Sequence, residues 1–581
     1  MPSLDETKEM PSSAQLPPEI ILLVCQELAA DRALGTLYHL ALTASTVAPI
    51  ALEQLYSLYD ISPAILGTYG KRAWGTRWRS ILMSTKGRTA YPYAAYLRTL
   101  SLGGNLDDVL SEMLGDKTVR QAFFAPPLEG LLCLWNDATR AQRHTRAYGL
   151  PRIDHAVTVS RCGEAIIEYI EKLARESDVK VALAHLETNS VPSGVLSAWC
   201  RRLGPGLISL RLRDGAILNK DIGVSLASEC PNFNDLTLFY CLTQSAEDNS
   251  PQDNLPAFLN ELQPNTLRNF EIMSKSSIGQ KSLAALSRQS KSLRSLKFSG
   301  LSLDALRALD RLTECTELEC FGLENDHFDR TDLVAQGLEL VSKLSAWIGR
   351  CSSLRDFRIV HGHDALHLVR DLLCTSNAPL ESLTLRHFSL MPTGQNRSIF
   401  EALARHKETL RELTIGHFWD PQDSVEKAPV SFLHPETTVI LDSICELKQL
   451  KVLNLQGAWV DSLDFARIVE HLPQLEELQI MSYETLEDHD LLAFHAFPNL
   501  RSLMIVTPTT FSHEALVSFV KGLDPIRQNG IQIDIMAQDR ENAPWQDVDL
   551  NEHIAAVNGS ITLGYARNID GDDDDSSSDS D

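Results

Sequence analysis

The chain has 581 residues, 44% of them hydrophobic, and a formal net charge of −24 with an isoelectric point near 5.1. This acidity argues against nucleic acid as the main partner, because phosphate binding needs a clustered basic surface. The sequence has no run of about 18 apolar residues, so no membrane span is expected. Its eleven cysteines form no C-x-x-C pair, which indicates reduced thiols in an intracellular protein of the cytoplasm or nucleus.

The N-terminal part of the chain is predicted to be helical after a short polar segment. Residues 1–15 carry no apolar signal-peptide core and are expected to form a disordered lead-in. Apolar residues then recur at helical spacing in residues 16–59, which predicts three short helices. Pro17 and Pro18 suit the first turn of the first helix, and Glu19 suits the positive end of its dipole.

Residues 60–96 form a connector in which aromatic and basic residues are interleaved. Such a mixture can bind nucleic acid. However, Trp74 and Trp78 are four residues apart, and on a helix this spacing favours a face packed onto the neighbouring domain. A helix is expected near residues 78–83.

A six-residue string, L-x-x-[LF]-x-[LIF], recurs along the rest of the chain. Neighbouring strings mostly begin 25 or 26 residues apart, which is the period of leucine-rich repeats. The longer steps are expected to contain insertion loops at residues 243–256 and 419–438, where prolines gather. The strings begin at Leu97, Leu207, Phe233, Leu267, Leu293, Leu318, Leu354, Leu380, Leu410, Leu450, Leu475 and Leu500.

Each repeat is predicted to join a strand to an amphipathic helix. In residues 464–472, for example, apolar side chains fall at positions i, i+3, i+4 and i+7. Stacked units of this kind form an α/β leucine-rich-repeat solenoid, with a parallel sheet on the concave side and helices on the convex side.

The solenoid is expected over residues 97–540. Three or four degenerate units are expected in residues 103–206, with strands near 128–131 and 179–186, and a last strand is expected at 531–535. Residues 541–569 would then form a C-terminal cap. Residues 570–581 contain seven aspartates and are expected to be a disordered acidic tail.

The segment that opens the first helix carries a family pattern. Leu16, Pro17, Glu19 and Ile20 are followed by spaced apolar residues, an Ala-Leu-Thr triplet and a closing leucine–tyrosine pair. This order resembles the F-box of fungal F-box proteins, and most of residues 16–540 is similar to the class that joins an F-box to leucine-rich repeats. The matching residues are Leu16, Pro17, Glu19, Ile20, Val24, Leu28, Leu34, Leu37, Leu40, Ala41, Leu42, Thr43, Leu52, Leu55 and Tyr56.

The resemblance implies a non-catalytic substrate receptor. F-box domains bind the Skp-family adaptor of SCF ubiquitin ligases, and through it a cullin, while the repeats hold the protein substrate; no cofactor or metal is implied. Two alternatives remain open: residues 16–59 cap the N-terminal end of the solenoid, or the repeats are an interaction scaffold without a ligase. The residues assigned to adaptor binding are Leu16, Pro17, Glu19, Ile20, Val24, Leu28, Leu34, Leu37 and Leu40.

The concave face is the expected substrate surface. The residue between the last two buried positions of each string should face outward from the sheet. Most of these positions are compatible with an ordinary solvated face, but basic residues among them suggest a strip for an acidic or phosphorylated motif. The strip consists of Arg211, Arg213, Lys297, Arg358 and Arg386.

Two further signals carry weaker hypotheses. His361, His363 and His367 have spacing suited to zinc, but no cysteine lies nearby, so an ordinary polar turn is favoured. Ser576 and Ser578 each precede an aspartate by three residues, which suits an acidophilic kinase, although a purely solubilising tail fits equally well. No nucleotide-binding, serine-hydrolase or zinc-protease motif is present, so the chain is not expected to be an enzyme.

Overall fold

The computed structural model divides into two compact units. The first comprises Met1–Phe239 and Glu261–Thr266, and the second comprises Tyr240–Asn260 and Leu267–Asp581. The structure describes residues 16–57, 68–113, 116–135, 153–176, 182–189, 191–242, 251–325, 333, 337–362, 364–389, 391, 395–419, 430–431, 438–482, 486–508, 511–537 and 550–565. The predicted acidic tail and the polar lead-in therefore lie outside the described residues.

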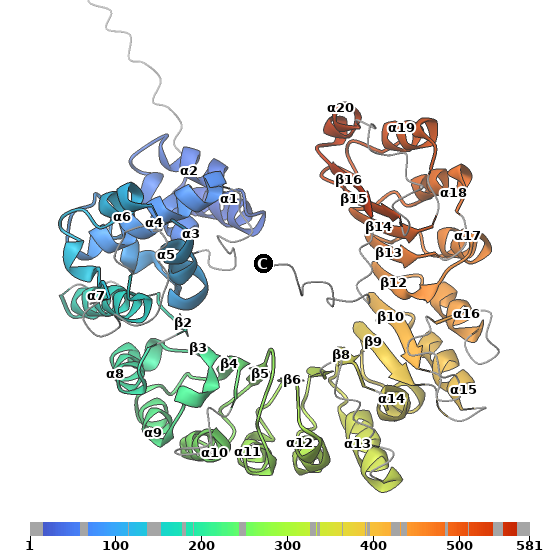
Figure 1. Ribbon diagram of the computed structural model, residues 1–581, viewed down its shortest axis with the longest axis horizontal. Helices are drawn as coiled ribbons and strands as arrows, with labels where there is room; N and C mark the ends of the chain where they lie inside the picture. The colour runs from blue at the N-terminus through green and yellow to red at the C-terminus, as the bar shows by residue number, and fades with distance from the viewer. Residues whose placement is uncertain are drawn as a thin grey trace, which may run out of the picture. The chain divides into compact units, whose positions relative to one another are not determined.

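The first unit begins with four helices, labelled in Figure 1. The three helices expected in residues 16–59 are present, and the connector helix is longer than the segment 78–83 predicted for it. The bounds are α1 (Pro18–Ala30), α2 (Leu34–Ala41), α3 (Ala48–Ser57) and α4 (Thr68–Thr85).

Side chains of α4 join it to α3. The Tyr56 hydroxyl lies 2.6 Å from Ser80 Oγ, and Arg77 Nη2 donates a 2.9 Å hydrogen bond to the Tyr56 carbonyl. The Arg77 guanidinium also lies 4.4 Å from the centre of the Trp74 ring. Trp74 and Trp78 are only 5% and 3% exposed, so the prediction that they pack internally is confirmed.

The remaining elements of the first unit are five α-helices and four strands among the described residues, and helix and strand alternate only from α7 onward. They are β1 (Thr99–Ser101), α5 (Asp107–Met113), α6 (Lys117–Phe123), α7 (His155–Glu176), β2 (His185–Thr188), α8 (Ser193–Leu203), β3 (Ser209–Asp214), α9 (Lys220–Glu229) and β4 (Asp235–Tyr240). The strands β1, β2 and β3 are parallel neighbours in that order.

The repeat prediction for residues 103–206 was wrong in detail. The strand expected near residues 179–186 overlaps β2 (His185–Thr188), which is the only strand among the described residues of this range, whereas three or four units were expected. Residues 128–131 do not form a strand, because Glu129–Leu131 is a short 3₁₀ helix. The 22-residue helix α7 accounts for the difference, since a helix of that length takes up most of one repeat period.

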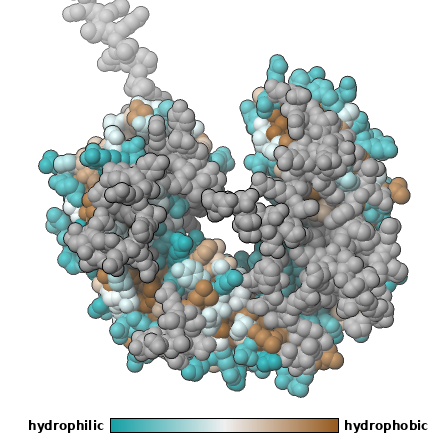
Figure 2. All heavy atoms as spheres, viewed as in Figure 1, coloured by the Kyte–Doolittle hydropathy of each residue, from teal (hydrophilic) through white to brown (hydrophobic). Residues whose placement is uncertain are grey.

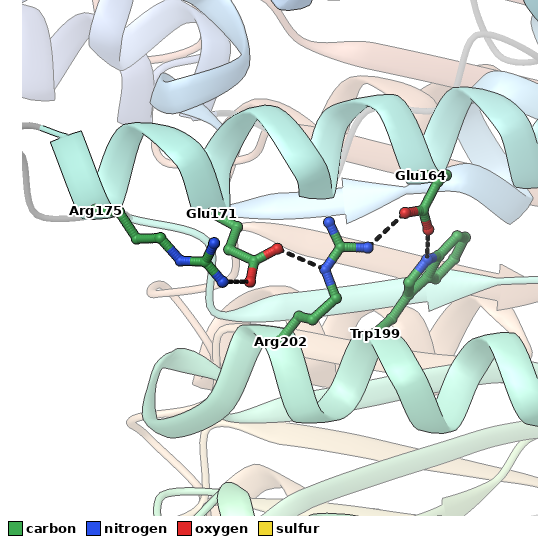
Figure 3. A network of polar contacts seen from close by, with 5 residues as sticks. All are labelled: Glu164, Glu171, Arg175, Trp199 and Arg202. Carbon is green, nitrogen blue, oxygen red and sulfur yellow. Dashed lines mark hydrogen bonds and ion pairs between the residues drawn. The ribbon is translucent and has the colours of Figure 1, made fainter.

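A polar network fixes α7 to α8 (Figure 3). Trp199 Nε1 donates a 2.7 Å hydrogen bond to Glu164 Oε2, and Arg202 Nε donates a 2.7 Å hydrogen bond to Glu171 Oε2. Arg202 also pairs with Glu164, and Arg175 pairs with Glu171. Burial raises the pKa of Glu164, but the hydrogen bonds from Trp199 and Arg202 outweigh it and lower that pKa. Each of these groups has a partner, so the network is structural.

The second unit contains the regular repeats. In Figure 1 its strands lie along one side and its helices along the other, and Figure 2 shows largely hydrophilic residues over α11 and α12. Its elements are α10 (Pro251–Glu261), β5 (Asn269–Ile272), α11 (Gln280–Leu286), β6 (Ser295–Ser299), α12 (Leu303–Arg307), β7 (Cys320–Glu324), α13 (Leu338–Arg350), β8 (Asp356–Val360), α14 (Ala365–Cys374), β9 (Ser382–Ser389), α15 (Asn396–Glu401), β10 (Glu412–Trp419), β11 (Val430–Ser431), α16 (Thr438–Glu446), β12 (Val452–Trp459), α17 (Ser462–His471), β13 (Glu477–Met481), α18 (Asp488–Ala493), β14 (Ser502–Thr507), α19 (His513–Lys521), β15 (Gln532–Ala537), α20 (Asn551–Ile554) and β16 (Ser560–Tyr565).

The register of this parallel sheet agrees with the prediction from the repeated string. Leu453 is fully buried and pairs with Leu413 on one side and Leu478 on the other. The outward residues also form one row across the strands from β5 to β14. In order they are Glu271, Lys297, Gly322, Arg358, Thr384, Thr414, Asn454, Gln479 and Met504. The chain is therefore an α/β protein with a repeated strand–helix solenoid.

Two predictions at the repeat boundaries were wrong. The expected insertion loop at residues 243–256 includes the start of α10, which contains Pro256 in its interior. The expected last strand, β15, pairs in parallel with a further strand, β16. The sheet thus continues into the segment predicted to be only a cap.

Candidate functional site

The first candidate surface lies on α1 in the first unit. Leu16, Ile20 and Val24 are 60%, 42% and 45% exposed. With 100° per residue, Ile20 and Val24 fall on one side of the helix, and the buried Cys25 and Ala29 fall on the opposite side. The helix is therefore apolar on both sides, and only one side is used by the core. We call Leu16, Ile20, Leu23 and Val24 the α1 stripe.

Most of the residues assigned to adaptor binding are accessible. Pro17 and Glu19 are exposed, and Leu28, Leu34 and Leu40 are half-buried. The assignment of Leu37 was wrong, because this side chain is fully buried and belongs to the small helical core.

Three exposed apolar residues of the first helices were not among the residues assigned to adaptor binding. Leu23 is 57% exposed and completes the α1 stripe, while Tyr38 and Leu42 are 52% and 66% exposed. Leu23 lies at helical spacing from Ile20, which is the signal that would have identified it. Exposed apolar patches of this kind mark interaction surfaces more often than isolated apolar residues do.

The second set of candidate residues lies on the open face of the strands within each unit. Arg211 and Arg213 are exposed on β3 of the first unit, and Lys297, Arg358 and Arg386 lie in the second unit. In the second unit the basic residues are interleaved with acids. Lys297 Nζ lies 3.8 Å from Asp356 Oδ2, and Arg358 Nη2 lies 3.2 Å from Glu324 Oε2.

The pKa values of the basic residues on this face depend on which charged groups lie beside each of them. Burial lowers the pKa of Lys297, but the neighbouring Cys320, Asp356 and Glu271 outweigh burial and raise it. Arg386 differs, because burial and then the charge of Arg358 lower its pKa more than Glu324 raises it. Lys297 and Arg386, both assigned to the predicted basic strip, therefore lie in different electrostatic environments.

The histidine segment does not form a metal centre among the described residues. The rings of His361 and His387 stack with their centres 4.1 Å apart, whereas His363 lies outside the described residues. No group of three or more potential metal-ligating side chains occurs in the part of the chain that the structure describes. Within the same part, no helix is long and apolar enough to cross a membrane.

Comparisons with known proteins leave the family open. No family model matches the chain, and no curated protein matches it. Among solved structures, the chain is similar to one in the crystal structure of the Rad7 and Elc1 complex in yeast, with 17% sequence identity and a TM-score of 0.37. The match covers 61% of this chain and 81% of that chain. A likeness this distant carries no information about function.

Proposed function

We propose that this chain is a non-catalytic substrate receptor of an SCF-type E3 ubiquitin ligase. In this proposal helices α1 to α3 act as an F-box that binds a Skp-family adaptor, and the repeats bind the protein substrate. The proposal combines the resemblance of residues 16–56 to fungal F-box proteins with one structural observation, the exposed α1 stripe.

The α1 stripe supports docking because its exposure has no use within the described fold. Burying an apolar side chain against a partner contributes roughly 1.5–3 kcal/mol per residue, so a patch of this size is sufficient for a stable contact. If residues 16–59 only capped the end of the solenoid, α1 would need no apolar side facing away from its buried residues.

The receptor would act by proximity. Holding a substrate on the same assembly as a ubiquitin-charged enzyme raises the effective concentration of the substrate's lysines, and the receptor itself supplies no reacting group. A protein with this role needs two separate surfaces, one for the adaptor and one for the substrate.

Capture of a Skp-family adaptor tests the proposal. The full chain with Ile20→Asp and Val24→Asp should lose adaptor co-purification by more than about tenfold, because two charges would be placed in an apolar interface. Gln26→Asp is the matched control, since it adds a charge at an exposed position of the same helix outside the stripe; it should leave capture unchanged.

Folding must be checked alongside capture. Ile20 and Val24 are exposed, so circular dichroism and the melting temperature should be unaffected by the substitutions. If the unmodified chain fails to capture the adaptor, the repeat scaffold without a ligase becomes the better description.

A further inference from the structure

Arg386, at the fifth position of β9, lacks a partner of opposite charge beside it in the sheet. Its register partners are Val360 on β8 and Gly416 on β10, neither of which can accept a hydrogen bond from a guanidinium through its side chain. Arg386 is half-buried. The described residues provide no ion pair to its side chain, whereas Arg358 is paired with Glu324 at 3.2 Å.

A pocket opens beside the strand neighbours of this arginine, although Arg386 itself is not among the lining residues. It has a volume of about 240 Å³ and is lined by Lys275, Ser299, Glu324 and His361, among others. The His361 N–H donates a 2.9 Å hydrogen bond to the Arg386 carbonyl, which places the backbone of residue 386 beside one residue of the pocket wall. Glu324 links the two features, because it lines the pocket and pairs with Arg358.

The charges that act on Arg386 are those of Arg358 and Glu324. Together the two arginines and the one glutamate carry one excess positive charge. The fork of a guanidinium matches the two oxygens of a carboxylate. A single carboxylate would neutralise the excess and leave the pair between Arg358 and Glu324 intact.

We propose that Arg386, supported by Arg358, recognises an acidic side chain in a segment of a partner protein that lies along this pocket. The inference rests on the proposed receptor function, because it assigns the substrate class to the repeat surface. It also reduces the proposed substrate contacts from the five basic residues of the predicted strip to Arg386 and Arg358, next to a pocket that Glu324 and His361 line.

The surroundings of Arg386 disfavour its positive charge. Burial and repulsion by Arg358 disfavour its charge, which lowers its pKa. A bound carboxylate would offset this effect, because an opposite charge favours the charged guanidinium.

A peptide-selection experiment tests the assignment. The full chain is immobilised and exposed to four peptide libraries. In each library the central residue is fixed as Glu, Asp, Gln or phosphoserine, and all other positions hold uncharged residues. The unmodified chain should bind the Glu or Asp library about fivefold more tightly than the Gln library, because a guanidinium forms two charge-assisted hydrogen bonds with a carboxylate. This preference should disappear in Arg386→Gln.

Arg355→Gln is the matched control, because Arg355 is an exposed arginine that pairs with Glu381; its preference should equal that of the unmodified chain. The proposal is overturned if the unmodified chain shows no preference for Glu or Asp, or if Arg386→Gln keeps that preference. Selection of phosphoserine over Glu by more than about tenfold would also overturn it, because the site would then recognise phosphate.

Thermal unfolding gives an independent readout that needs no ligand. Arg386→Gln should leave the melting temperature unchanged or raise it by about 1 °C, because it removes a disfavoured charge. A fall of more than about 1 °C would show a structural role and overturn the proposal. Adaptor capture should be the same in this variant, so failure of the pocket assignment is distinguishable from failure of the receptor function.

Discussion

At the residue scale, the absence of a side chain at Gly163 determines how α7 packs. A Cβ atom there would lie 2.6 Å from Trp199 Cη2 and 2.7 Å from Leu102 Cδ1, both of which belong to fully buried side chains. Gly163→Ala should therefore destabilise the protein by about 1–3 kcal/mol through overpacking, despite alanine's better helix propensity. Urea unfolding measures the change.

Gly194 provides the matched comparison for this substitution. It also lies in a helix of the same unit, but a Cβ atom there would meet nothing within 4 Å. Gly194→Ala should be neutral or stabilising by up to about 1 kcal/mol. If both alanine variants were equally stable, the close approach of α7 and α8 at Gly163 would be wrong.

The Glu164 network makes a second prediction at this scale, concerning pH. Because the folded-state pKa of Glu164 is lowered, its stabilising effect is fully present above the ordinary glutamate value near 4.5 and is lost as the pH falls through the folded-state pKa. Arg202→Met should cost about 1 kcal/mol at neutral pH, a modest value because Glu164 is 48% exposed. The difference from the unmodified chain should shrink below about pH 4.

Lys172→Met is the control for the pH experiment. Lys172 and Glu176 lie 4.0 Å apart on α7 and are 67% and 65% exposed, so the substitution should change stability by less than about 0.5 kcal/mol at any pH. A constant difference between Arg202→Met and the unmodified chain across the acid range would contradict the role assigned to Glu164.

At the element scale, the register of β12 gives a direct test of the repeat. Leu453 is fully buried, whereas its neighbour Asn454 faces outward and donates a 2.8 Å hydrogen bond to Gln479. Leu453→Asp should destabilise the protein by about 4 kcal/mol or more, because it buries a charge. Asn454→Asp should cost less than about 1 kcal/mol, since the Gln479 amide can reorient to donate.

Comparable losses of melting temperature in the two β12 variants would refute the register. The comparison is informative because the substitutions introduce the same residue at adjacent positions. It therefore separates the direction of each side chain from the general effect of a new aspartate.

The strands of the second unit were predictable because two independent periods coincide there. Alternate burial within a strand and a 25- or 26-residue spacing between strands both select Leu453 and its equivalents. Residues 103–206 lack this agreement, because α7 spans 22 residues and spaces the strands differently. The start of α10 was missed because prolines were taken as loop signals, whereas Pro251 begins the helix and Pro256 is tolerated inside it.

The candidate sites were predictable only in part. A family pattern does not distinguish interface residues from core residues, which is why Leu37 was assigned to the adaptor surface. The sequence could have predicted that acidic residues lie among the basic residues of the open face. Glu324 and Asp356 are two positions from outward residues of their strands, and residues two apart in a strand face the same side. The pocket near Arg386 depends on the ends of several strands, and strand ends carry no repeated signal.

At the scale of the whole molecule, the net charge of −24 predicts how stability responds to salt. Repulsion among like charges destabilises the folded state. Salt weakens this repulsion, because the screening length falls from about 30 Å at 0.01 M to about 8 Å at 0.15 M. Salt also weakens surface ion pairs, but each exposed pair contributes only about 0–1 kcal/mol. We therefore expect the melting temperature to rise over this range of sodium chloride.

Removal of residues 570–581 tests whether net charge is the cause. This segment carries seven aspartates and no basic residue, so the shortened chain has a net charge of −17. If long-range repulsion dominates, the shortened chain should show a smaller rise in melting temperature with salt, because there is less repulsion to screen. An unchanged rise would show that the repulsion arises among charges of the folded units, and a fall with salt in both chains would show that ion pairs such as that between Arg358 and Glu324 outweigh the net charge.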